Sequence, residues 1–279
     1  MNDNWIIKQL ENSLGTWNEK LAELWQLVTQ TPESFKGGQI WGVVTGIHSA
    51  LVGVGYGLLV LFFAMGVFQS AASFRELQRP EFALRYFIRF AAAKVAVGRG
   101  MEIMTAIYSV CGGIVSAVMG GVGGAVQETA TLPAELVTAV EQVGFFNSIP
   151  LWLVSFLGSL FITVMSFILI LTVYGRFFRL YMYTALSPIP LAAFAGEETA
   201  AIGKAFIKSY AGVCLEGAVI VLACVIYSAF LSSSAPTVDT TLPAVTMVWK
   251  YLGEILFNML VLTGLVKGAD RIIREMFGL

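Results

Sequence analysis

The chain has 279 residues, of which 57% are hydrophobic and only 13% are charged. Soluble domains are roughly 45–50% apolar, so a mean hydropathy of +0.78 excludes an ordinary soluble protein and predicts an integral membrane protein. The formal net charge of −1 carries no sign of a polyanion-binding chain, and the placement of charge along the sequence is more informative.

Residues 1–39 are predicted to form an extracytoplasmic amphipathic helix. Apolar residues recur at alternating spacings of three and four, which is typical of such a helix; they are Ile7, Leu10, Leu14, Trp17, Leu21, Leu24 and Val28. Two interpretations remain open. The helix lies in the membrane interface with Trp5, Trp17 and Trp25 at headgroup level, or its apolar stripe packs on a neighbouring subunit.

Residues 40–279 are predicted to form a transmembrane domain whose first span covers residues 40–68. At about 1.5 Å per residue this run crosses a hydrocarbon core of about 30 Å. Small residues let helices approach closely, so a helix-packing face is expected at Gly42, Gly46, Gly53 and Gly57. His48 is expected in the bundle interior, either as a hydrogen-bonded packing residue or as a proton-relay or ligand group.

Basic residues follow the first span. Pro80 and Glu81 suit the first turn of a helix, and we expect one long helix that begins in the cytoplasm and enters the membrane as a second span, residues 95–121. Glu102 is expected to pair with Arg99 or a neighbouring basic residue rather than to line a pore. The basic residues either report topology, because positive charge is retained inside, or contact phosphates of nucleic acid or lipid. The candidate cytoplasmic basic surface is Arg75, Arg79, Arg85, Arg89, Arg176 and Arg179.

A short amphipathic helix is predicted to open at Leu132-Pro133, in an acidic external loop, before a third span at residues 150–174. An elbow, residues 176–198, comes next. Pro188 and Pro190 disfavour the α conformation at the residue before each of them, so we expect the helix to break at Ser187, with Ser187 and Ile189 extended. Broken backbone is tolerated only against protein, beside water or at headgroup level, so the elbow is a hinge, a re-entrant loop or an interfacial segment.

Two further spans are predicted at residues 210–230 and 244–266. If the elbow does not cross the bilayer, most of the 17 lysines and arginines lie on one side, so we expect five spans with the N-terminus outside and the C-terminus inside. Glu216, Lys250 and Glu254 then lie within spans, where charge costs about 2.5–3.5 kcal/mol. They either line a conduit or are satisfied internally, Glu216 by a helix-to-helix hydrogen bond and Lys250 with Glu254 as an i, i+4 pair.

No residue pattern supports catalysis or a metal site. The sequence has one histidine, three cysteines without a Cys-x-x-Cys motif, no HExxH and no GxSxG. Cys111, Cys214 and Cys224 are interpreted as packing residues. We expect no enzyme activity and no cofactor other than a bound phospholipid.

The elbow sequence RFFRLYMYTALSPIPLAAF, together with five spans and an external N-terminal segment, resembles the TrbL-like and VirB-type polytopic inner-membrane subunits of type IV secretion and conjugal transfer systems. The family's Ala-x-x-Pro-Ile-x-x-Ala type turn is matched by Ala185, Pro188, Ile189 and Ala192. The resemblance implies an all-α, non-enzymatic channel or scaffold subunit of the bacterial plasma membrane. It also implies homo-oligomerisation, contacts with lipids and secretion ATPases, and passage of a DNA and relaxase substrate.

Two alternatives from other classes remain open. A secondary transporter or small-solute channel would explain a broken helix, although the odd number of spans and the lack of an inverted repeat count against it. A holin-like pore would explain the glycines and the amphipathic helices, but it leaves the basic helix after the first span unexplained.

Overall fold

The computed structural model describes residues 5–71, 80–121, 130–143, 145–233, 238–239 and 241–279, and these form helices with no strand among them. Among these residues, five helical stretches are long and apolar enough to cross a membrane. They are Phe35–Gln69, Gly100–Gly121, Ile149–Leu186, Ala200–Leu231 and Ala244–Phe277. The prediction of an all-α polytopic membrane protein with five spans is confirmed.

The chain divides into two compact units. The first unit comprises Met1–Thr29, Ser116–Tyr174 and Ala218–Ala269, and the second comprises Gln30–Val115, Gly175–Gly217 and Asp270–Leu279. Each unit therefore assembles segments that are distant in the sequence, and each is described by itself.

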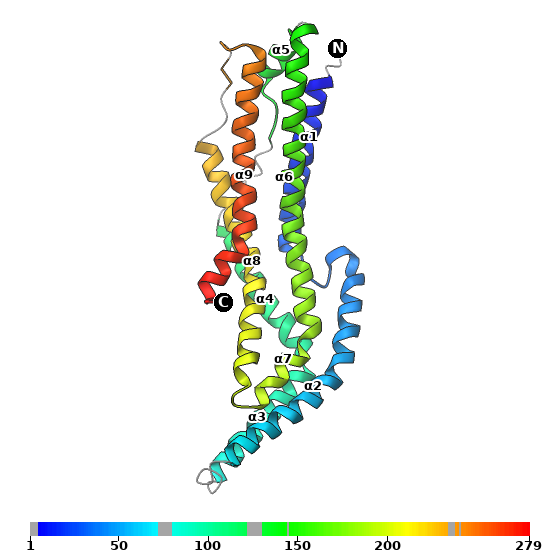
Figure 1. Cartoon of the computed structure of the whole chain (residues 1–279), viewed down its shortest axis with the longest axis vertical. Helices are drawn as coiled ribbons and strands as arrows, with labels where there is room; N and C mark the ends of the chain where they lie inside the picture. Colours follow the sequence, from blue (N-terminus) through cyan, green and yellow to red (C-terminus); the bar gives the residue numbers. More distant parts are fainter. Residues whose placement is uncertain (1–4, 72–79, 122–129, 144, 234–237, 240) are drawn as a thin grey trace. The chain divides into compact units, whose positions relative to one another are not determined.

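In the first unit, α1 (Trp5–Thr29) runs parallel to α6 (Phe145–Leu186), as Figure 1 shows in blue and green. The rings of Trp5 and Trp152 lie 6.0 Å apart, and 22 residues further along α6 the hydroxyl of Tyr174 donates to Glu23 Oε1 at 2.5 Å. Trp17 and Trp25 are buried, and only Trp5 remains exposed. The expectation of three tryptophans at headgroup level is therefore wrong for two of them, because the apolar stripe is buried within the chain.

The loop before α6 is tied to the rest of the first unit by specific hydrogen bonds. The Asn18 side chain pairs with both the N–H and the carbonyl of Ala130 at 2.9 Å, and Tyr251 donates to the Thr131 carbonyl at 2.7 Å. The predicted short helix is present as α5 (Ala134–Glu141), with Leu136 and Val140 buried.

In the second unit, α2 (Gln39–Ala71) is followed by α3 (Pro80–Gly98) and α4 (Gly100–Gly121). The single long helix expected here is wrong, because the helix is interrupted at Arg99. The backbone hydrogen bonds Arg99 N to Val95 O and Ile103 N to Arg99 O persist. The interruption is flanked by Gly98 and Gly100, and Arg99 and Glu102 form the expected, exposed ion pair at 3.9 Å.

The elbow is more compact than predicted. Helix α6 continues through the two arginines to Leu186, and α7 (Pro188–Ala192) and a 3-10 helix (Ala193–Ala195) follow before α8 (Ala200–Ser233) and α9 (Ala244–Phe277). The break at Ser187 is confirmed. The expected extended geometry is wrong, because Ser187 has φ −53° and ψ −32° and Ile189 lies inside α7. Pro188 opens a new helix, where its missing donor costs nothing, and Leu191 N donates to Ser187 O at 3.1 Å.

Candidate functional site

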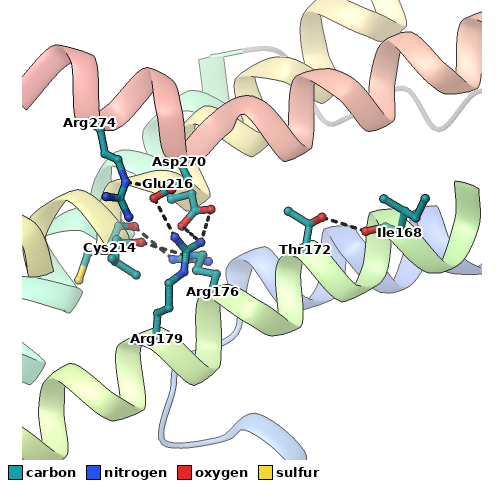
Figure 2. Close-up of polar contacts among 9 residues, drawn as sticks. Ile168, Thr172, Arg176, Arg179, Cys214, Glu216, Asp270 and Arg274 are labelled. Atoms are coloured by element: carbon teal, nitrogen blue, oxygen red, sulfur yellow. Dashed lines mark hydrogen bonds and ion pairs between the residues drawn. The ribbon is translucent and has the colours of Figure 1, made fainter. Parts of the chain in front are cut away.

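A charged cluster in the second unit joins three helices (Figure 2). We use "charged cluster" for Arg176 and Arg179 of α6, Glu216 of α8, and Asp270 and Arg274 of α9. The two α6 arginines are three residues apart and the two α9 residues four apart, and such spacings put side chains on one helical face.

Arg179 is the centre of the cluster. Its Nη2 lies 2.6 Å from Oε1 and 2.7 Å from Oε2 of Glu216, and its Nη1 lies 2.7 Å from Oδ1 of Asp270. The Glu216 side chain is only 1% exposed, whereas that of Arg179 is 27% exposed. Arg274 holds the second oxygen of Asp270 at 3.0 Å. One guanidinium therefore links α6, α8 and α9.

Arg176 is buried without a carboxylate bonded to it. Its Nε and Nη2 donate to the carbonyls of Val213 and Cys214 at 3.3 and 3.2 Å, while Nη1 has no hydrogen-bond partner. The guanidinium carbon lies 5.9 Å from the ring centre of Tyr108, within cation–π range. Arg176 is 1% exposed, so its assignment to a basic surface is wrong.

Gly217 makes room for Arg176. A Cβ at this position would lie 2.7 Å from the guanidinium carbon, so any larger residue would force the buried arginine to move. The adjacent thiols of Cys111 and Cys214 contribute a further contact between α4 and α8. These cysteines act as packing residues in the described structure, where all three are free.

The charged cluster can hold helices together, and it offers no obvious reactive group. Removing one partner of a buried ion pair costs about 3–5 kcal/mol, because the other charge stays buried. No group of His, Cys, Asp and Glu side chains that could hold a metal ion is found in the described part of the chain. The arrangement is therefore suited to bracing helices.

The elbow is seated against α2 and the α3–α4 junction within the second unit. A Cβ on Gly55 would lie 2.9 Å from the carbonyl oxygen of Pro188, and one on Gly100 would lie 3.3 Å from Ser187 Oγ. Beneath it lies an apolar core that comprises Leu59, Ala93, Val97, Leu191, Ala192 and Ala195. Contact with protein, one of the expected settings for broken backbone, is present.

Two polar contacts fix the end of the elbow. Arg89 Nη1 lies 3.0 Å from Glu197 Oε2, and Gln69 Nε2 donates to Glu198 Oε2 at 2.9 Å. Arg85 is exposed. Arg75 and Arg79 lie outside the described residues. Within the predicted basic surface, Arg89 and Arg179 are thus engaged by carboxylates of the same chain.

The remaining predicted residues lie apart from the charged cluster. His48 is 5% exposed, and its Nε2, which has no hydrogen-bond partner, points at Gly100 near Ser187. Lys250 and Glu254 line a groove of the first unit. The four candidate packing glycines are exposed, with nothing within 4 Å of a Cβ built on any of them. They are Gly42, Gly46, Gly53 and Gly57.

Asp270 and Gly217 were missed by the sequence reasoning, which placed Gly55 only in a general helix-packing series and Arg274 only among the cytoplasmic basic residues. The i, i+4 pair of Asp270 and Arg274 at the end of the last span was a readable signal of a helix-end ion pair. Nothing in the sequence distinguishes Gly217 from the other glycines, because its role depends on a side chain 41 residues earlier in the chain.

These features define an all-α multi-pass membrane protein in which a charged cluster links three helices and two prolines form an elbow. A family model described as "TrbL/VirB6 plasmid conjugal transfer like protein" matches residues 17–188. The chain belongs to this family, which makes it a component of a conjugal transfer system. Family membership implies association with other type IV secretion subunits. Searches of curated proteins and of solved structures found no significant match.

Proposed function

We propose that this chain is a non-enzymatic channel or scaffold subunit of a conjugative type IV secretion system. In this role it self-associates in the bacterial plasma membrane and helps to form the path for a DNA and relaxase substrate. The N-terminus lies outside, the C-terminus lies in the cytoplasm, and the cytoplasmic surface contacts the energising ATPases. No cofactor other than bound phospholipid takes part.

The family match over residues 17–188 is the observation that carries this proposal, and the bracing of α6, α8 and α9 by Arg179 is compatible with it. A guanidinium that donates to Glu216 through Nη2 and to Asp270 through Nη1 makes charge-assisted hydrogen bonds to two other helices, and such bonds suit a subunit whose spans have to keep their relative positions. Glu216 is 1% exposed and already paired. This favours a bracing role for Glu216 over the lining of a conduit.

The position of the charged cluster along the spans agrees with the proposed orientation. Arg176 and Arg179 follow the predicted third span, and Asp270 and Arg274 follow the predicted fifth span. Positive charges at these ends belong on the cytoplasmic side. The charged cluster would then lie near the cytoplasmic boundary of the hydrocarbon core, on the side where the ATPases bind.

Plasmid transfer in a donor strain that lacks the gene tests the proposal. Complementation with the wild-type gene is expected to restore transconjugant formation, and Arg179→Gln is expected to reduce it strongly. Arg274→Gln is the control, because that side chain is 59% exposed and Asp270 keeps Arg179. Normal transfer in the deletion strain, or solute uptake by purified protein in vesicles, would overturn the proposal and favour a transporter.

A further inference from the structure

An open groove runs along α9 in the first unit. It has a volume of about 550 Å³, and three aromatic side chains form its apolar walls: Phe230 near the end of α8, and Trp249 and Phe257 of α9. The exposed fractions of Trp249 and Phe257 are 62% and 59%. The groove thus presents a large apolar surface within a candidate membrane span.

Polar side chains form a stripe along the same groove. Lys250, Glu254 and Asn258 line it at intervals of four residues, so they lie on one face of the helix in successive turns. Lys250 is exposed, Glu254 is half-buried and Asn258 is 8% exposed. The stripe therefore leads from the surface into the span.

The charges of Lys250 and Glu254 do not neutralise each other. No ion pair joins Lys250 to Glu254 in this fully described helix, contrary to the i, i+4 pair that the sequence allows. Lys250 also acts electrostatically on Asp239. The pKa of Asp239 lies below the ordinary value, chiefly because the Thr241 hydroxyl and N–H donate to it and, to a smaller extent, because of the Lys250 charge. Both charges can therefore still take a partner.

In a parallel second copy, identical residues lie at the same height, and opposite charges come within reach of each other on the diagonal. Charged groups such as Lys250 and Glu254 are costly to expose to hydrocarbon, and the stripe carries both signs four residues apart, about 6 Å along the helix axis. When two parallel helices meet at the same level, Lys250 of one lies one turn from Glu254 of the other. Asn258 amides both donate and accept, so they can bond across the contact.

Gly253 leaves the floor of the groove open. Nothing lies within 4 Å of a Cβ built there, so a neighbouring helix can approach the backbone of α9, as small residues allow in membranes. We propose that this face of α9 docks on the same face of α9 in a second copy of the chain, with Lys250 of one copy paired to Glu254 of the other. The inference rests on the self-association included in the proposed function.

Charge reversal in mixed assemblies tests the contact. Two full-length copies with different tags are co-expressed, and the fraction that co-purifies from membranes is measured. Lys250→Glu in both copies, or Glu254→Lys in both, is expected to lower co-purification at least about fivefold. A Lys250→Glu copy expressed with a Glu254→Lys copy restores complementary charges only between copies, and we expect recovery close to the wild-type fraction.

The matched control is Lys267→Glu, the same charge change at an exposed residue of α9 outside the groove. It should leave co-purification unchanged. A Gly253→Cys variant gives an independent measurement, because all three native cysteines are buried. Oxidation of membranes with copper phenanthroline should then give a covalent dimer that the wild-type chain does not form.

Three results would overturn the α9 contact: unchanged co-purification in the single reversals, no recovery in the mixed pair, or no dimer from Gly253→Cys. Loss in the single reversals without recovery would identify a lipid or another subunit as the occupant. If wild-type copies themselves fail to co-purify, the self-association part of the proposed function fails as well, so the two failures are distinguishable.

Discussion

A single nitrogen of Arg179, Nη2, lies between the two carboxylate oxygens of Glu216, at 2.6 and 2.7 Å. These residues come from the third and fourth candidate spans, and the other terminal nitrogen of the same guanidinium binds Asp270 from the fifth. Because a guanidinium is planar and holds its donors in a fixed fork, this contact restricts both the distance between the helices and their rotation.

Arg179→Gln is expected to destabilise the protein by about 3 kcal/mol, the low end of the cost of breaking a buried pair, because Arg179 is partly exposed. Glu216 would be left buried without its main partner. Thermal unfolding in detergent would measure the loss. The double variant Arg179→Gln/Glu216→Gln removes both charges and should recover part of the stability. A double variant no more stable than the single one would contradict this account.

Gly217→Ala should lower the unfolding temperature, because the new Cβ would lie 2.7 Å from the buried Arg176 guanidinium. Overpacking of this kind costs about 1–3 kcal/mol. Gly175→Ala, beside Arg176 on α6, is the matched control, since its Cβ would have nothing within 4 Å. The control should be neutral or stabilising by up to about 1 kcal/mol. Equal melting of the two variants would show that Arg176 is not confined.

Gly55→Ala should displace the elbow from its contact with α2. Its Cβ would lie 2.9 Å from the Pro188 carbonyl oxygen, and a backbone atom cannot move aside as the end of a side chain can. We expect a lower unfolding temperature together with reduced plasmid transfer. Gly113→Ala, at an exposed glycine of α4 with nothing within 4 Å of a Cβ built there, should behave as wild type. A wild-type unfolding temperature and wild-type plasmid transfer in Gly55→Ala would contradict the close contact between Gly55 and the Pro188 carbonyl.

Hydropathy and positive charge were sufficient to predict the five spans, and the two prolines were sufficient to predict the break at Ser187, because these features depend on local sequence. The charged cluster was less accessible to sequence reasoning. Arg179 and Asp270 are 91 residues apart, and no local pattern indicates which spans will be neighbours. Arg176 could be recognised as basic but not as buried, since its burial depends on the space left by Gly217. The geometry at Ser187 was mispredicted because a local preference before proline yielded to the start of a new helix.

The exposed glycines of α2 remain a prediction about assembly. Gly46→Leu or Gly53→Leu should reduce the size of the purified complex without affecting membrane insertion, because neither position contacts the rest of the chain. Size-exclusion chromatography coupled to mass measurement would detect the change. Gly113→Leu, at an exposed and equally open glycine of α4, controls for the added apolar bulk. An unchanged complex would count against a packing role for this face.

The proposed orientation can be tested by cysteine labelling, since the native cysteines are buried. Ile202 is 55% exposed and lies just after the elbow, and Thr241 is exposed in the connection before α9. If the elbow does not cross the bilayer, Thr241→Cys should react with a membrane-impermeant maleimide added outside spheroplasts. Ile202→Cys should react only after permeabilisation. Both variants must be inserted at wild-type levels. External labelling of Ile202→Cys would mean that α8 and α9 have the opposite orientation in the membrane. The charged cluster could then no longer lie on the cytoplasmic side.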